Sequence, residues 1–119
     1  MASSKDIALT VINTLTQPPK ISNYSTSVIE GAVLFGALNN LQDSKEEFCF
    51  TYTIDRNFGL YLESVNNVKG SKEDHTFWQL LTKTPSGEVP LTTGIGCYQP
   101  KKDEHIILKF RKWDEKTCI

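Results

Sequence analysis

The sequence lacks both an excess of charge of one sign and a long apolar run. Its 13 lysines and arginines face 14 aspartates and glutamates, which gives a net charge of -1. Nucleic-acid binding relies on a basic surface that displaces counterions, so we expect no nucleic-acid partner. No apolar stretch reaches the roughly 18 residues of a membrane-spanning helix, and the first six residues lack the apolar centre of a signal peptide. The chain is therefore either cytosolic or the mature part of a secreted protein.

Signatures of metal binding and catalysis are missing as well. Cys49, Cys97 and Cys118 show no CxxC or Cys/His spacing, which argues against a zinc site. They fit either one disulfide and one odd thiol or three free thiols. His75 and His105 stand beside acidic residues in stretches that we interpret as solvated turns. Because no GxSxG elbow, GxGxxG loop or P-loop occurs, the sequence predicts a protein that is not an enzyme.

Hydrophobic periodicity predicts most of the secondary structure. With 119 residues, 39% of them hydrophobic, the chain can form one domain over 1–119, with tails at 1–5 and 114–119. Alternation predicts strands over 6–13, 22–29, 48–54, 59–65, 76–81 and 105–111. Helical spacing of Leu34, Ala37, Leu38 and Leu41 predicts an amphipathic helix over 32–42. This order predicts an α+β fold: a β-grasp-like mixed sheet in one layer, with one helix packed on one face.

The strand over 48–54 has the clearest alternation. Phe48, Phe50, Tyr52 and Ile54 share one face, and we expect that face to lie in the core. Turn residues follow at 55–57, so 59–65 is predicted to return as the second arm of a hairpin. The 6–13 and 22–29 strands are also expected to form a hairpin. The second of them contains Asn23-Tyr24-Ser25, an N-glycosylation acceptor sequence that is informative only in a secreted chain.

Aromatic residues near glycines and turns are the first hint of a binding surface. Phe58, Tyr61, Phe77, Trp78 and Tyr98 lie where rings and bare backbone groups can face a ligand. The same rings can equally complete the core of a small domain. The pattern alone leaves both interpretations open.

Three segments carry a resemblance to a known family. They read NFGLYLESVNNV at 57–68, TFWQLL at 76–81 and GIGCY at 94–98. In this order and spacing they resemble the C-terminal β domain of the transcobalamin, intrinsic factor and haptocorrin family of vitamin B12 carriers. The similarity runs from about Asp6 to Trp113, although Phe58 stands where family members commonly have tryptophan. It implies a secreted, extracellular, non-enzymatic domain that covers one side of a corrin ring, with cobalamin as a possible ligand.

The resemblance also implies the ligand contacts. They are Asn57, Phe58, Gly59, Leu60, Tyr61 and Leu62 in one segment, and Trp78, Gln79, Leu80, Leu81, Pro90 and Leu91 in the other. Backbone groups there would bond the corrin's peripheral amides, and apolar side chains would pack on the ring edge. Catalytic residues and a protein metal site are not expected.

In full-length carriers a helical domain covers the other side of the ligand. This chain is expected either to pair with a helical partner chain, to bind a corrinoid weakly alone, or to hold another ligand. The alternative is a secreted interaction module that has lost cobalamin binding. If the chain is secreted, Cys49 and Cys97 are the expected disulfide, which leaves Cys118 for a disulfide-linked dimer.

Overall fold

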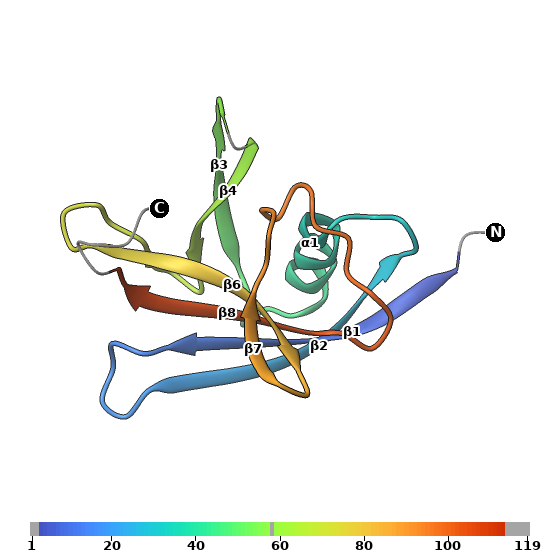
Figure 1. Cartoon of the computed structure of the whole chain (residues 1–119), viewed down its shortest axis with the longest axis horizontal. Helices are drawn as coiled ribbons and strands as arrows, with labels where there is room; N and C mark the ends of the chain where they lie inside the picture. The colour runs from blue at the N-terminus through green and yellow to red at the C-terminus, as the bar shows by residue number, and fades with distance from the viewer. Residues whose placement is uncertain (1–2, 58, 114–119) are drawn as a thin grey trace.

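One helix and eight strands make up the part of the chain that the structure, a computed structural model, describes: residues 3–57 and 59–113 (Figure 1). In chain order they are β1 (Ser4–Asn13), β2 (Lys20–Ile29), α1 (Leu34–Ser44), β3 (Phe50–Asp55), β4 (Gly59–Val65), β5 (Val68–Lys69), β6 (Thr76–Thr84), β7 (Gly87–Pro90) and β8 (His105–Lys112). Because β1 begins at Ser4, Ser4 and Lys5 belong to a strand and not to the predicted tail.

The strands fall into two sheets. The larger sheet has the order β2-β1-β8-β6-β7, and the smaller has the order β3-β4-β5. Strands β1 and β8 are parallel and the other pairs are antiparallel, so the larger sheet is mixed. The prediction of an α+β fold with a mixed sheet and one helix on a face is confirmed. The prediction of a single layer is wrong, because β3, β4 and β5 form a separate sheet whose β3–β4 hairpin projects away from the larger sheet (Figure 1).

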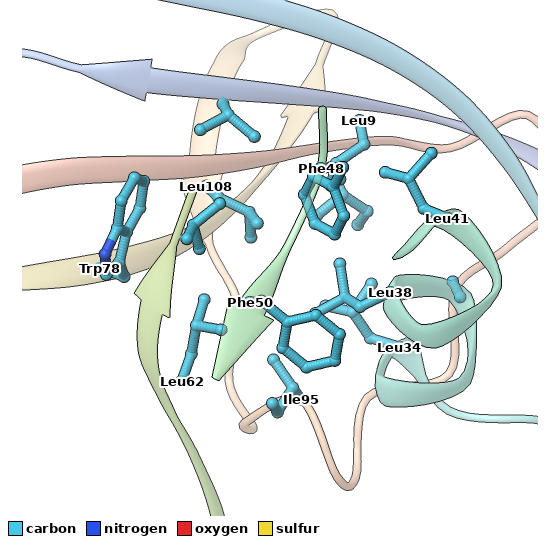
Figure 2. Close-up of a cluster of buried hydrophobic side chains, with 14 of the residues drawn as sticks. Leu9, Leu34, Leu38, Leu41, Phe48, Phe50, Leu62, Trp78, Ile95 and Leu108 are labelled. Carbon is cyan, nitrogen blue, oxygen red and sulfur yellow. The ribbon is translucent and has the colours of Figure 1, made fainter. Parts of the chain in front are cut away.

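The core lies between α1, the inner face of the larger sheet and the base of the hairpin (Figure 2). The alternation predicted for the first and last strands is confirmed. Their inward side chains, Ile7, Leu9, Val11, Ile106, Leu108 and Phe110, are buried, as are Leu34, Ala37, Leu38 and Leu41 of α1. In the parallel register, Leu9 stands opposite Ile106 and Val11 opposite Leu108, so one apolar surface extends across the centre of the sheet.

The helix occupies 34–44 where 32–42 was predicted, and a distant loop completes its first turn. Its first backbone N–H groups lack partners within the helix, and Val33 at the N-cap supplies no side-chain bond. Instead, Leu34 N–H donates to the Tyr98 carbonyl over 2.7 Å, and Phe35 N–H donates to the Ile95 carbonyl over 2.8 Å. The 94–98 segment is thereby fixed against the helix.

No helix within the described residues is long and apolar enough to cross a membrane.

Candidate functional site

The β3–β4 hairpin carries most of the uncovered apolar side chains near the first predicted segment. Phe50 is buried at its base, but Tyr52 is 44% and Ile54 80% exposed. The prediction that this whole face lies in the core is therefore wrong for its outer half. The strand register shifts between Thr51 and Tyr52, and the Tyr52 ring meets the Phe35 ring at a steep angle with the ring centroids 4.9 Å apart.

The tip of the hairpin has an open backbone. Asn57 is exposed, and its N–H donates to Oδ1 of Asp55 over 2.8 Å. Gly59 begins β4 with φ at +77°, a conformation that glycine adopts without strain, and a Cβ there would meet nothing within 4 Å. Phe58, the predicted contact between them, lies outside the described residues. The tip therefore leaves the backbone at Gly59 uncovered by any side chain.

Leu60 joins two of the segments that carry the family resemblance. Its side chain is half-buried, and a Cβ on Gly96 would come within 3.2 Å of it. A Cβ on Gly94 would come within 3.3 Å of the Leu60 carbonyl oxygen. The glycines of 94–98 thus allow this loop to approach β4 closely, and the loop that contacts the start of α1 also supports the hairpin.

The next two predicted contacts face opposite ways, as strand alternation requires. Tyr61 is 47% exposed, and partial burial raises the pKa of its hydroxyl. Leu62 is buried in the core (Figure 2). Of the pair, only Tyr61 is placed to present its side chain to a ligand.

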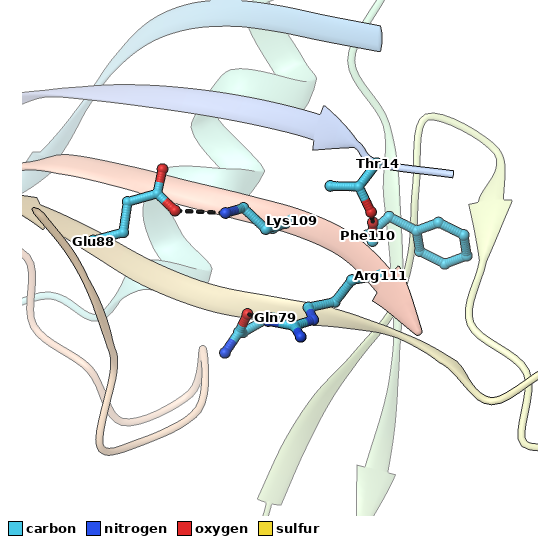
Figure 3. A network of polar contacts seen from close by, with 6 residues as sticks. All are labelled: Thr14, Gln79, Glu88, Lys109, Phe110 and Arg111. Carbon is cyan, nitrogen blue, oxygen red and sulfur yellow. Dashed lines mark hydrogen bonds and ion pairs between the residues drawn. The ribbon is translucent and has the colours of Figure 1, made fainter. Parts of the chain in front are cut away.

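Most of the second predicted segment contributes to packing. Trp78 is 5% exposed, its ring centroid lies 5.0 Å from that of Phe110, and its indole N–H donates to the Val68 carbonyl over 2.8 Å. Leu81 is equally buried. Gln79 lies on the opposite face of the sheet, where its Oε1 accepts a 3.1 Å hydrogen bond from Arg111 (Figure 3).

The remaining residues of that segment are only partly covered. Leu80 and Leu91 are half-buried against the core and are joined by a 3.0 Å bond from Leu91 N–H to the Leu80 carbonyl. Pro90 is exposed at the end of β7. The structure therefore does not gather the second segment into one ligand-facing surface.

A polar cluster that the sequence did not reveal anchors the loop between β7 and β8. The carboxylate of Glu104 accepts hydrogen bonds from the Tyr98 hydroxyl, from Thr82 Oγ1 over 2.7 Å and from Lys101 N–H over 2.7 Å. Burial alone would raise the pKa of Glu104, but these hydrogen bonds outweigh it and the pKa is lowered. Burial, together with the Glu104 bond and charge, raises the pKa of Tyr98 to about 12. No local pattern links Thr82 to Glu104.

The predicted Cys49–Cys97 disulfide is wrong, because both residues are free thiols. Cys49 exchanges backbone and side-chain hydrogen bonds with Asn66 at the base of the hairpin. Cys97 lies in the loop that packs against Leu60. Along the chain, Leu60 is six residues from Asn66. Six extended residues span roughly 20 Å, whereas bonded cysteines have Cα atoms less than about 7 Å apart. Cys118 lies outside the described residues.

Neither histidine forms a catalytic arrangement. His75 stacks on Trp113 with ring centroids 5.2 Å apart. Nε2 of His105 lies 2.6 Å from Oγ1 of Thr10, whose only proton is donated to Asn23. His105 must therefore donate its Nε2 proton to the Thr10 oxygen. A catalytic base would instead accept the proton of the hydroxyl. Over the described ranges, no group of three or more His, Cys, Asp or Glu side chains is placed to hold a metal ion.

Comparison with known proteins gives clear relatives. No family model matches the sequence. Cobalamin binding intrinsic factor from dog is 34% identical over 114 residues, which cover 94% of this chain and 26% of the relative. The human intrinsic factor is 32% identical with the same coverage, and human transcobalamin-1 is 26% identical over 75% of this chain and 20% of its own. The chain thus spans about a quarter of the length of the curated relatives it matches.

Solved structures share the fold. The structure of haptocorrin in complex with Cbi matches with a TM-score of 0.78 and 20% identity over 95% of this chain and 26% of that one. A candidate metal-binding protein from Ruminococcus gnavus matches with a TM-score of 0.59 and 15% identity, over 92% of this chain and 99% of that one. The intrinsic factors and transcobalamin-1 are named for binding or carrying cobalamin and not for a reaction. This chain therefore belongs to the intrinsic factor, transcobalamin and haptocorrin family and corresponds to the C-terminal part of these carriers.

Proposed function

We propose that this protein is a small-ligand-binding domain that holds one side of a corrinoid against the tip of the β3–β4 hairpin. The observation that carries the proposal is the exposure of Tyr52 and Ile54 on one face of a hairpin that leaves the rest of the fold (Figure 1). Tyr61, paired with Thr53, is exposed on the other face of the hairpin. A protein surface rarely leaves large apolar side chains together in water unless they meet a partner. The relatives that share this segment are named for cobalamin binding.

The chemistry of the tip suits the edge of a large, flat ligand. Apolar side chains can pack on the ring, while the backbone at Gly59, which no side chain covers, can approach amide groups at its periphery. Leu60 is supported from behind by the glycines of the 94–98 loop, so little ordering is needed on binding. Phe58 stays in the proposed contact set through its place in the sequence. Leu62 and Trp78 are proposed to act by supporting the surface from the core, and Leu81 by packing on the opposite face of β6.

A surface hollow elsewhere fits this ligand less well. A hollow of about 720 Å³ lies along β1 and β2, next to α1, and is lined mostly by polar side chains such as Asp6, Ser25, Ser27 and Asn40. Apolar ring edges gain little from such a lining. We therefore place the corrinoid at the hairpin tip.

The hairpin can cover only part of such a ligand. Tight small-molecule sites bury most of the ligand surface, so the remaining cover is proposed to come from outside residues 1–119, as a helical partner chain or a further part of a longer protein. What supports this is that the chain matches only about a quarter of the carriers' length. The same relationship supports an extracellular place of action.

The test is equilibrium dialysis against cyanocobalamin, whose axial positions are both occupied, so that histidine coordination does not contribute. Ile54→Ser should weaken binding by about 1–2 kcal/mol, or about 5- to 30-fold in Kd, because a newly covered isoleucine contributes on this scale. Ile21→Ser is the matched control: Ile21 is 58% exposed on β2, an edge strand of the larger sheet and not part of the hairpin.

Two outcomes would contradict the proposal. Equal effects of the Ile54 and Ile21 substitutions would place the ligand away from the hairpin. If no variant binds cyanocobalamin even at millimolar protein, the chain is instead an interaction module that has kept the fold and lost the corrinoid.

A further inference from the structure

Strand β2 forms an outer edge of the larger sheet, where β1 is its only neighbour. The Ser27 carbonyl of β2 points away from β1, because it accepts a 2.9 Å hydrogen bond from Asn40 of α1. On β1, the carbonyl of the paired Asp6 points the other way and accepts from Asp103 N–H over 2.8 Å. In an antiparallel ladder every second residue repeats this orientation. The residues of β2 whose backbone groups face outward are therefore Ile21, Asn23, Ser25 and Ser27.

The helix covers only one end of this row of outward groups. The bond to Ser27 and a 3.3 Å bond from Thr26 Oγ1 to the Ala37 carbonyl attach α1 to the end of β2. The outward backbone groups of the other three residues form no hydrogen bond within the described part of the chain. Natural proteins usually protect such edges with proline or charge, but residues 21–25 read ISNYS and contain neither. We call 21–25 the open edge.

Three hollows follow the open edge along β2. Their volumes are about 720, 520 and 390 Å³. From β2, the first is lined by 25–27, the second by 23–25, and the third by Lys20, Ser22 and Tyr24. The end of α1 and the residues that follow it, 44–47, line them as well. An extended strand therefore has room to lie beside β2 along the whole open edge.

Unpaired charges of opposite sign flank the open edge. Lys20 precedes it and lines the third hollow. Glu47 lines the third hollow and also the second, which lies further along β2 beside Ser25. Both side chains are exposed, and within the described ranges neither forms an ion pair. The surface along β2 thus carries a free positive charge at its start and a free negative charge further along.

We propose that two copies of this chain associate through their β2 edges. An antiparallel pair about a twofold axis is self-complementary, so that each contact occurs twice. A pairing that uses all three free outward residues places Asn23 opposite its own copy and Ile21 opposite Ser25. Each of these pairs then exchanges N–H and carbonyl hydrogen bonds as in an ordinary antiparallel ladder. The pairing joins the two five-stranded sheets into one.

The same register brings the free charges together. Lys20 of one copy stands opposite Thr26 of the other, and Tyr24 is its diagonal neighbour, which a long side chain can reach. Tyr24 shares the second hollow with Glu47. Lys20 and Glu47 of opposite copies therefore meet twice in the pair. This complementarity favours a second copy over a strand of another protein, because the copy always supplies the lysine.

The size of the contact indicates how tight the dimer is. A single pair of short strands buries less than the about 1,200 Å² at the lower end of standard interfaces, so we expect weak and reversible association. The inference does not rest on the proposed function. Strand β2 belongs to the larger sheet, whereas the proposed ligand surface belongs to the hairpin of the smaller one (Figure 1). Ile54→Ser should therefore leave the dimer unchanged, and sedimentation and dialysis succeed or fail separately.

The experiment is analytical ultracentrifugation of the full chain from about 10 µM to about 1 mM, a range that suits weak association. A reducing buffer prevents the thiols from linking the copies. We expect the mass to rise from that of the monomer towards that of the dimer. Lys20→Glu and Glu47→Lys should each raise the dimer Kd about tenfold, because two contacts change from attraction to repulsion. An equal mixture of the two variants should again associate like the natural chain, since both contacts then join opposite charges.

Ser25→Pro tests the backbone pairing. The Ser25 N–H points away from β1, so proline there removes a hydrogen bond of the dimer and none within the chain. This variant should keep its circular dichroism spectrum and lose the dimer. If it fails to fold, the mixture of the two charge variants decides. A natural chain that stays monomeric at the highest concentration would overturn the proposal. So would a mixture that associates no better than its separate components, or a folded Ser25→Pro protein that dimerises as before.

Discussion

Replacing Trp78 by phenylalanine tests whether this residue supports the fold or contacts the ligand. The substitution removes the 2.8 Å bond to the Val68 carbonyl, which leaves the acceptor of a partly buried residue without this partner. That loss costs about 1–3 kcal/mol. The smaller ring also leaves a gap beside Phe110, which adds about 1 kcal/mol. We expect Trp78→Phe to lower the free energy of unfolding by about 2–4 kcal/mol.

The assay is urea unfolding followed by far-ultraviolet circular dichroism, because tryptophan fluorescence changes with the substitution itself. Tyr61→Phe is the control: that side chain is 47% exposed, so its stability should change by less than about 0.5 kcal/mol. Under native conditions, Trp78→Phe should alter cyanocobalamin affinity by less than about twofold. Unchanged stability together with a loss of binding of about tenfold or more would show that Trp78 is a ligand contact and refute its placement in the core.

The remaining predictions concern stability. Gly36→Ala should stabilise the protein by about 0.5–1 kcal/mol in urea unfolding, since helical glycine is unfavourable and the new Cβ would lie 3.8 Å from Val28; destabilisation would show that the contact is too tight. Gly70→Ala should instead destabilise by about 1–3 kcal/mol, because its Cβ would meet a β6 carbonyl oxygen at 3.1 Å. The lowered pKa of Glu104 means that its contribution to stability is present above its usual value of 4.5 and is lost as the pH falls through the lower folded value. The raised pKa of Tyr98 means that its contribution is lost as the pH rises from 10.0 towards about 12. Tyr98→Phe should flatten both slopes of stability against pH, and unchanged slopes would contradict the assigned cause.

Strand alternation predicted which side chains share a face, and it succeeded where both ends of a strand stay on the core. This holds for Leu9 in β1 and for Leu108 in β8. It failed at Tyr52 and Ile54, because a two-residue period carries no information about where a strand leaves the sheet. The strand order of the larger sheet depends on the pairing of β1 with β8, a contact between strands far apart in the sequence that no local pattern encodes.

The candidate site was predicted in part for a similar reason. The family resemblance located the hairpin tip, and the structure leaves Asn57, Gly59 and Tyr61 open there. The resemblance could not distinguish residues that contact the ligand from residues that support the site. An aromatic residue such as Trp78 gives the same sequence pattern in either role. The Cys49–Cys97 pairing failed because it depends on a distance through space that spacing in the sequence does not give.

The parallel pairing of β1 and β8 has a consequence for how the protein is made. The two strands at the centre of the sheet are contributed by the first and last strands of the fold, with Ala8 opposite His105. Synthesis must therefore pass His105 before β1 can gain its second neighbour, and until then the β1–β2 hairpin exposes apolar side chains such as Leu9. Contacts of such long sequence separation slow folding. The nascent chain is consequently at its greatest risk of aggregation just before β8 is complete.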